Sequence, residues 1–107
     1  MFMNNEELKI TENVDNGICH ISAKGRVDSN NADILLVKLE DALNNGQKSI
    51  ILNMAQVNYL SSIGIRVILK IFKQASENGG SFNIDRPSEI VRNVLGMVAL
   101  KEMLVTN

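Results

Sequence analysis

The sequence predicts an α/β domain that spans residues 1–107, with a mixed sheet of four to five strands and helices packed mainly on one face. Three observations indicate this class. Two early segments alternate apolar and polar residues, which is the period of strands with one solvent-exposed face. Later segments repeat apolar residues at helical spacing. Short apolar runs separate these helical segments, so the expected order is β-β-α-β-α-β-α, and 107 residues suit one domain.

The first two strands are expected at residues 8–14 and 18–24. The turn Asp15-Asn16-Gly17 between them is a strong reverse-turn signal, so the two strands form a hairpin. The alternation of the second strand predicts one apolar and one polar face, Cys19, Ile21 and Ala23 against His20, Ser22 and Lys24.

A loop at residues 25–31 is rich in capping residues, and a helix then runs from Ala32 to about Leu43. Gly46 can take the left-handed conformation that ends this helix. A continuous apolar centre predicts a third strand inside the sheet at residues 48–53. The first helix has a single apolar stripe, made by Ala32, Leu35, Leu36, Leu39 and Leu43.

The second helix begins near Ser62 and stops at Asn78-Gly79-Gly80, and a fourth strand follows at residues 81–85. Pro87 suits the first turn of a third helix, which Gly96 ends. Residues 103–105 form either a last strand or a docked tail. The expected core stripe of the second helix is Gly64, Val67, Ile68, Ile71, Phe72 and Ala75. The third helix has an apolar side, made by Ile90, Val91, Val94 and Leu95.

The composition excludes several classes of protein. The net charge is −1, from 11 basic and 12 acidic residues, so direct binding to nucleic acid is not expected. Cys19 is the only cysteine, which excludes an internal disulfide and fits a reducing cytoplasm. The N-terminus has no signal pattern and no apolar run has the length of a membrane span, so direct membrane contact is not expected either.

Two hydroxyls, those of Ser61 and Ser62, lie where a strand gives way to the second helix. Serine is a preferred N-cap worth ~1 kcal/mol, so one of them caps the helix whatever the function. The other hydroxyl can accept a phosphate, whose charge is favoured at a helix N-terminus. Ser62 is the first choice for this modification and Ser61 the second, and Arg66 lies one turn further on to pair with a phosphate.

Apolar and basic side chains lie together on the second helix beside these serines. Ile65 and Leu69 are one turn apart at the border of the core stripe, next to the cationic residues Arg66, Lys70 and Lys73. One interpretation is a protein-docking edge. The other is that Ile65 and Leu69 pack under a neighbouring loop, and the sequence favours neither.

No catalytic, metal or cofactor site is expected. A serine nucleophile needs a nearby base, and the only histidine, His20, lies in mid-strand on the polar face. Gly-x-Ser-x-Gly and phosphate-loop motifs are missing. The acidic residues that could bind a metal are scattered singly, at Asp28, Asp33, Asp41 and Asp85.

Residues 59–69, the turn Gly25-Arg26-Val27-Asp28 and the order of elements together resemble the STAS domain family, in particular its stand-alone bacterial anti-sigma factor antagonists. The family has a Gly-Glu-Leu-Asp turn here, with Arg26 in the place of its glutamate. Asn53-Met54-Ala55 matches an Asp-Leu-Ser step. The family hallmark Asp-Ser-Ser-Gly-Leu-Gly aligns with residues 61–66, so Ser62 falls on the phosphate acceptor and Ser61 replaces the aspartate.

The resemblance implies partner switching without enzyme activity. An unphosphorylated antagonist binds an anti-sigma factor, which is a serine kinase with a histidine-kinase-like ATPase domain, and this frees a sigma factor. Phosphorylation ends the binding, and a PP2C-type phosphatase restores it. The alternatives are a STAS-type adaptor in a signalling or lipid-transport complex without phospho-switching, and a small-molecule or nucleotide-binding domain or an enzyme that uses Ser61 or Ser62. The implied partner-binding residues are Asp28, Ser61, Ser62, Ile63, Gly64, Ile65, Arg66 and Leu69.

Overall fold

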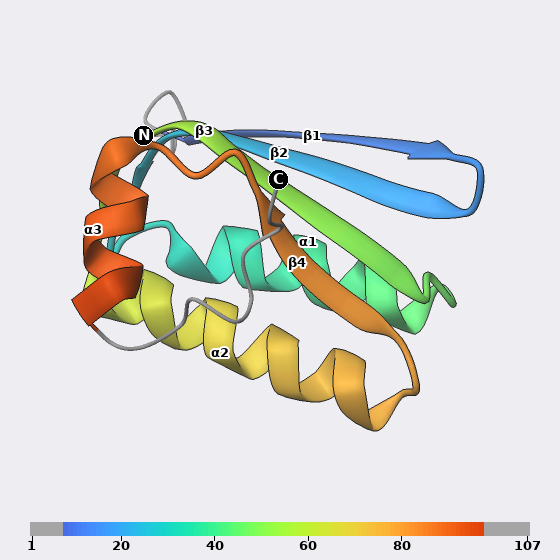
Figure 1. Cartoon of the computed structure of the whole chain (residues 1–107). Helices are drawn as coiled ribbons and strands as arrows, with labels where there is room; N and C mark the ends of the chain where they lie inside the picture. Colours follow the sequence, from blue (N-terminus) through green and yellow to red (C-terminus); the bar gives the residue numbers. More distant parts are fainter. Residues whose placement is uncertain (1–7, 98–107) are drawn as a thin grey trace, which may run out of the picture.

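One mixed sheet and two helices beneath it make up most of the structure, a computed structural model that describes residues 8–97 (Figure 1). The strands are β1 (Leu8–Asp15), β2 (Ile18–Val27), β3 (Ser49–Leu60) and β4 (Ser81–Asp85). The helices are α1 (Ala32–Asn44), α2 (Ser62–Glu77) and α3 (Glu89–Met97). The predicted fold class and the order β-β-α-β-α-β-α are therefore confirmed, whereas the expected last strand or tail at residues 103–105 lies outside the described residues.

The strands lie side by side in sequence order, β1-β2-β3-β4. The β1–β2 hairpin is antiparallel, as predicted, and its turn places Asn16 and Gly17 at φ 54° and 79°. Both residue types tolerate this left-handed backbone, and two such residues in a row give the turn that matches strand twist. The pairs β2–β3 and β3–β4 are parallel, because α1 and α2 carry the chain back between them.

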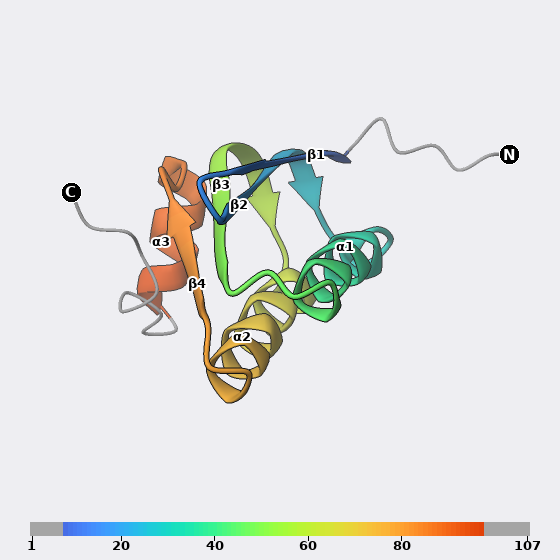
Figure 2. The same cartoon turned by 90° about the vertical axis from the view of Figure 1, so that its right-hand side faces the viewer.

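Helices α1 and α2 pack side by side against one face of the sheet (Figures 1 and 2). The core lies between them and the sheet, and residues such as Ile21, Leu35, Leu52 and Ile68 are fully buried there. In the part of the chain that the structure describes, no helix covers the opposite face of the sheet (Figure 1). The prediction of helices mainly on one face is correct.

Strand β3 is longer than predicted, because it continues past Asn53 to Leu60. Beyond Asn53 it carries two extra residues relative to β2, since Ser22 pairs with Asn53 but Val27 pairs with Leu60. These irregularities are β-bulges, which interrupt the apolar–polar alternation and so hide the strand from a search for period 2. The Asn53 side chain stabilises the first bulge, where its Oδ1 accepts a hydrogen bond from the Ala55 N–H at 2.9 Å.

Helix α3 lies beside the second half of β3, beyond the end of β4 (Figure 1). The segment that leads into it continues the pairing: the Ser88 N–H donates to the Met54 carbonyl (3.1 Å), and its hydroxyl donates to the Val57 carbonyl (2.6 Å). Ser88 Oγ also accepts from the Val91 N–H at the start of α3. Strand β3 leads directly to Ser61, and α3 packs against the second half of that strand.

One expected core residue is exposed. Phe72 is 36% exposed, so including it in the core stripe of α2 was wrong. Ile90, on the apolar side of α3, is 42% exposed. Gln74 and Lys70 contact Glu40 of α1, and Phe72 lies on the opposite flank of α2 at 100° per residue. The side chain of Leu95 lies outside what the structure describes.

A charged side chain points from β1 toward the helices. Glu12 accepts from Lys38 of α1 at 2.8 Å and from the Cys19 thiol at 3.4 Å. The Lys38 ammonium and the thiol lower the pKa of the Glu12 carboxyl, with Lys38 the larger cause. Burial, and then the Glu12 carboxylate, raise the pKa of Cys19 to about 11. The expected apolar face of β2 is confirmed, since Cys19, Ile21 and Ala23 are all buried.

Candidate functional site at the start of helix α2

The two adjacent serines have different environments. Ser61 has an extended backbone, and its hydroxyl accepts a hydrogen bond from the Gly64 N–H at 3.2 Å. Its carbonyl accepts from the Ile65 N–H (3.0 Å), and its own N–H donates to the Val27 carbonyl (2.9 Å). Ser61 is therefore the N-cap of α2, which decides which of the two hydroxyls has the capping role.

Ser62 is the first residue of α2 and is exposed. The first N–H groups of a helix have no partner within the helix, and the helix dipole adds a partial positive charge there. The Ser62 hydroxyl is thus accessible to another protein and lies where a phosphate is electrostatically favoured. Arg66, also exposed, is four residues further along the same helix, at the spacing of side chains that can pair.

Gly64 holds the start of α2 against the ends of β2 and β3. A Cβ at this position would lie 2.6 Å from Leu60 Cδ1 and 2.8 Å from Val27 Cγ1, which is closer than real contacts. Val27 and Leu60 are both buried and pair across the two strands. Glycine is required here because the helix approaches these side chains so closely, not because of a left-handed backbone.

The loop before α1 is fixed by Asp28 and Asn31. The Asp28 carbonyl accepts from the N–H groups of Asn31 and Ala32, and the Asp28 N–H donates to Asn31 Oδ1 at 2.9 Å. Asn31 Nδ2 in turn donates to the Arg26 carbonyl at 3.0 Å. Asn31 is only 6% exposed, and its amide satisfies backbone groups that would otherwise be unpaired in the interior. This role of Asn31 was not predicted, although its position directly before the apolar stripe of α1 was a signal for it.

Arg26 connects this loop to β3. Its guanidinium lies 4.2 Å from the centroid of the Tyr59 ring, and its Nε lies 3.5 Å from Asp28 Oδ2. Tyr59 is 41% exposed and directly opposite Arg26 in the strand register. Through the cation–π contact and the ion pair, Arg26 joins Asp28 to Tyr59, which lies two residues before Ser61. The sequence alone could not show this contact, because it depends on the two bulges in β3.

The surface next to Ser62 is both apolar and cationic. Ile63 is 38% exposed and Leu69 is 42% exposed. Ile65 is instead packed against the core, so the two residues expected at the border of the core stripe differ. Leu69 is available on the surface for a partner, whereas Ile65 contributes to packing. We use "the outer face of α2" for six side chains that lie on one side of this helix, Ser62, Ile63, Arg66, Leu69, Lys70 and Lys73.

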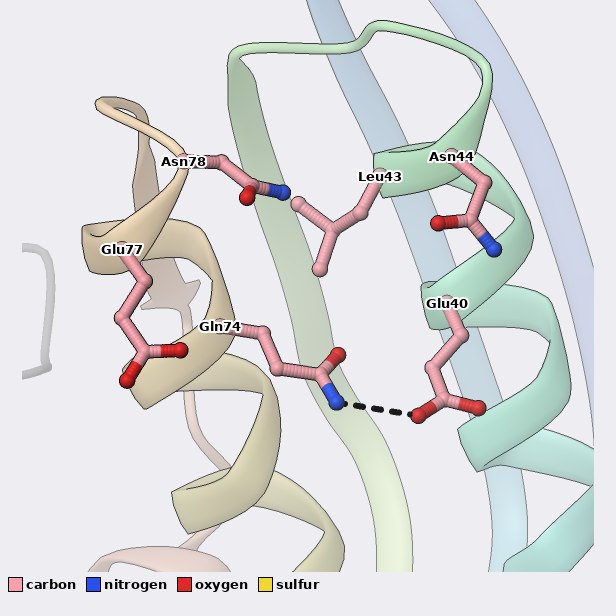
Figure 3. A pocket seen from close by; sticks show the side chains of 6 residues that line it. All are labelled: Glu40, Leu43, Asn44, Gln74, Glu77 and Asn78. Atoms are coloured by element: carbon pink, nitrogen blue, oxygen red, sulfur yellow. Dashed lines mark hydrogen bonds between the residues drawn. The ribbon is translucent and has the colours of Figure 1, made fainter.

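A hollow of about 290 Å³ lies at the other end of the helices, between the carboxyl-terminal ends of α1 and α2 (Figure 3). Gln74 Nε2 donates to Glu40 Oε2 across it at 3.1 Å, as Figure 3 shows. Its other lining residues include Leu43 and Glu77. Ser62 is separated from Glu77 by the 16-residue length of α2, about 24 Å. This hollow is therefore separate from the site at Ser62.

His20, the single histidine of the sequence, lies far from Ser62. His20 pairs with Ile51, whereas Val27, which bonds Ser61, lies seven positions further along β2, about 23 Å at the rise of a strand. Among residues 8–97 no group of three or more His, Cys, Asp and Glu side chains could hold a metal ion. None of the helices described is both long enough and apolar enough to cross a membrane.

Three comparisons with known proteins agree with the fold. The model of the STAS domain family matches residues 9–107. A Bordetella bronchiseptica protein named "Putative anti-sigma factor antagonist BtrV" is 29% identical over 87 residues, which cover 81% of this chain and 75% of that protein.

Two solved structures have the same fold at low sequence identity. The anti-sigma factor antagonist SpoIIAA in its unphosphorylated form gives a TM-score of 0.78 at 20% identity, over 92% of this chain and 85% of that one. The Bacillus cell fate determinant SpoIIAA in the phosphorylated form gives a TM-score of 0.73 at 19% identity, over 92% of this chain and 88% of that one.

Proposed function

The chain belongs to the STAS domain family, and from this we propose that it is an anti-sigma factor antagonist, which binds an anti-sigma factor and so releases a sigma factor. The name of the Bordetella relative supports this assignment. The observation that carries it is the exposed Ser62 at the start of α2, with the apolar and cationic outer face of α2 beside it. A surface of this kind suits a protein partner better than a small substrate.

We propose that phosphorylation of Ser62 switches this binding off. A phosphate adds about −1.5 to −2 charges and three acceptor oxygens. At Ser62 the fold tolerates it, because the side chain is exposed and the N-terminus of α2 favours the charge. A partner that contacts Ile63 and Arg66 instead meets a new dianion in the interface. The phosphorylated form of the SpoIIAA neighbour is consistent with a fold that survives this modification.

Ser61 and Asn53, which stand where the family has acidic residues, both accept hydrogen bonds from nearby backbone N–H groups. Ser61 caps α2 through Gly64, and Asn53 accepts from Ala55 at the bulge. Serine and asparagine accept a backbone N–H as aspartate does, so these replacements preserve the geometry around Ser62 and reduce only the negative charge.

The proposed partners are an anti-sigma factor with a histidine-kinase-like ATPase domain that phosphorylates Ser62, and a PP2C-type phosphatase that removes the phosphate. In this proposal the chain is a ligand and a substrate, not an enzyme, and it acts in the cytoplasm. The distance of His20 from Ser61 supports the proposal that the chain is not an enzyme. The single, buried cysteine, Cys19, supports the proposed location in the cytoplasm.

The test uses the purified chain and an anti-sigma factor with a histidine-kinase-like ATPase domain from the same organism. Calorimetry measures their binding, and mass spectrometry after incubation with ATP locates the phosphate. We expect a complex, a single phosphate on Ser62, and loss of the complex afterwards. Ser62→Ala should bind and stay unmodified, and Ser62→Asp should bind much more weakly.

Ser76 provides the matched control, because it is an exposed serine near the other end of α2. Ser76→Asp should leave both binding and phosphorylation unchanged. Stable binding with Ser62 unmodified would instead favour the adaptor without phospho-switching. Absence of any complex, with the circular dichroism of a folded protein, would contradict the antagonist role itself.

A further inference from the structure

The face of the sheet opposite α1 and α2 carries a hollow of about 300 Å³ that the proposed function does not use. It lies over β2 and β3 at the first bulge, where Asn53 and Gln56 flank Ala55. The other side chains that line it come from β2 and from the residue after β4: Ser22, Ala23, Lys24 and Arg86.

The polar groups of this hollow are suited to an anion. Lys24 and Arg86 are cations, and Ser22, Asn53 and Gln56 offer a hydroxyl and two amides. Asn53 Oδ1 is already used by the Ala55 N–H, so the donor end of this amide remains for a ligand. Among residues 8–97 no carboxylate lines the hollow, and the ion pair of Arg86 with Asp85 is long, at 3.8 Å.

A pair of like charges adjoins the hollow. Lys9 of β1 and Lys24 of β2 are directly opposite in the antiparallel register and both are exposed. Their Cβ atoms are therefore about 4.5–5.5 Å apart on the same face, an arrangement that destabilises a sheet. A bound anion would neutralise this repulsion. The protein as a whole has a net charge of −1, so the clustering of Lys9, Lys24 and Arg86 is local.

The backbone of Arg86 is an independent sign of function. Its φ is 52°, in the left-handed region that a long side chain adopts at a cost. Strained residues of this kind persist mainly at ligand sites, where the strain holds a group in place. Here the strained residue supplies one of the two cations of the hollow.

We propose that this hollow binds a phosphate group, either as inorganic phosphate or as the phosphate of a small ester such as a nucleotide. The volume is at the small end of ligand sites, and the lining is polar rather than apolar, which suits a compact anion. Arginine and lysine together are the usual protein partners of phosphate oxygens. This site is distinct from Ser62, and its occupation does not require the proposed antagonist role.

The test is an NMR titration of the ¹⁵N-labelled chain with inorganic phosphate, with AMP and with adenosine, each at the same ionic strength set with sodium chloride. We expect saturable shifts at Ser22, Lys24, Asn53, Gln56 and Arg86 with the two phosphate-bearing probes and none with adenosine. Stronger binding of AMP than of inorganic phosphate would identify an ester as the preferred source. The reverse order would identify the free ion.

Two variants and one control make the result specific. Arg86→Gly removes a cation and relieves the left-handed backbone, and Lys24→Gln removes the second cation. Each should weaken phosphate binding about tenfold, the factor that corresponds to about 1.4 kcal/mol. Lys48→Gln removes an exposed cation that does not line the hollow and should leave phosphate binding unchanged. Thermal unfolding of Arg86→Gly checks that the variant remains folded. Shifts spread over all surface cations, or binding that both variants leave intact, would overturn the proposal.

Discussion

The hydroxyl of Ser61 accepts a hydrogen bond from the backbone N–H of Gly64, and this contact separates the roles of the two adjacent serines. Ser61 is committed to the start of α2, whereas the next hydroxyl, that of Ser62, is exposed. A structural serine directly before an accessible one allows the accessible one to be modified without loss of the helix cap.

The first prediction concerns stability at these serines. Ser61→Ala should lower the free energy of unfolding by about 1 kcal/mol, because it removes the cap of α2. Ser62→Ala should change it by less than about 0.5 kcal/mol, as is usual for an exposed side chain. Urea unfolding followed by circular dichroism measures both. Equal losses in the two variants would mean that Ser62 also holds the helix.

The second prediction concerns the close approach at Gly64. Gly64→Ala should lower the free energy of unfolding by about 1–3 kcal/mol, because the new methyl group overlaps Leu60 and Val27. Gly96 in α3 is the control, since a Cβ there meets nothing within 4 Å. Gly96→Ala should be neutral or slightly stabilising. In Gly64→Ala with Val27→Ala the two losses should be less than additive, because the second change makes room for the methyl group.

The third prediction concerns acid. The pKa of Glu12 is below its usual value of 4.5 in the folded chain, mainly because Lys38 donates to it. The folded state therefore binds this proton less readily than the unfolded state. The resulting stabilisation is fully present above about pH 4.5 and is lost as the pH falls through the lowered pKa.

An NMR titration of the Glu12 carboxyl measures this pKa directly. Lys38→Met should raise it toward 4.5, and Lys73→Met, far along α2, should leave it unchanged. An unchanged Glu12 pKa in the Lys38 variant would show that the 2.8 Å ion pair does not persist in solution.

The fourth prediction concerns the thiol. Burial raises the pKa of Cys19 to about 11 from 9.0, so the folded state holds this proton more tightly than the unfolded state. The associated stability is present below pH 9 and is lost as the pH rises through about 11. The decrease in the free energy of unfolding at alkaline pH should be smaller in Cys19→Ala, which lacks the thiol.

Labelling with a thiol reagent gives a second measurement on Cys19. At neutral pH the folded protein should react slowly, because the side chain is fully buried and protonated. Denaturant should make the reaction fast. Rapid labelling of the native protein would show that β1 and β2 separate readily.

The sequence was sufficient for the fold class and for most element positions, because the apolar periods of β2, α1 and α2 largely agree with the burial of their residues. It was insufficient for the second half of β3. There the bulges replace a regular alternation by buried residues at Val57 and Leu60, three positions apart. The contact between Arg26 and Tyr59 depends on this shifted register, so it could not be predicted either.

The candidate site was predicted in its position but not in all its contacts. The motif located Ser61, Ser62 and Gly64 correctly at the start of α2. Periodicity alone could not decide whether Ile65 or Phe72 is buried, because both lie at the border of the apolar stripe. The packing of neighbouring elements decides it: Ile65 packs against the core, and Phe72 remains 36% exposed.

Strand β1 is the outermost strand of the sheet, and its free backbone groups could recruit a strand from another molecule. The inward Glu12 opposes this, because its ion pair with Lys38 borders that open edge and a joining chain would have to bury both charges. The same contact that holds α1 against the hairpin thus opposes the addition of a foreign strand at β1. Acidic conditions, which discharge Glu12, weaken this protection of the β1 edge.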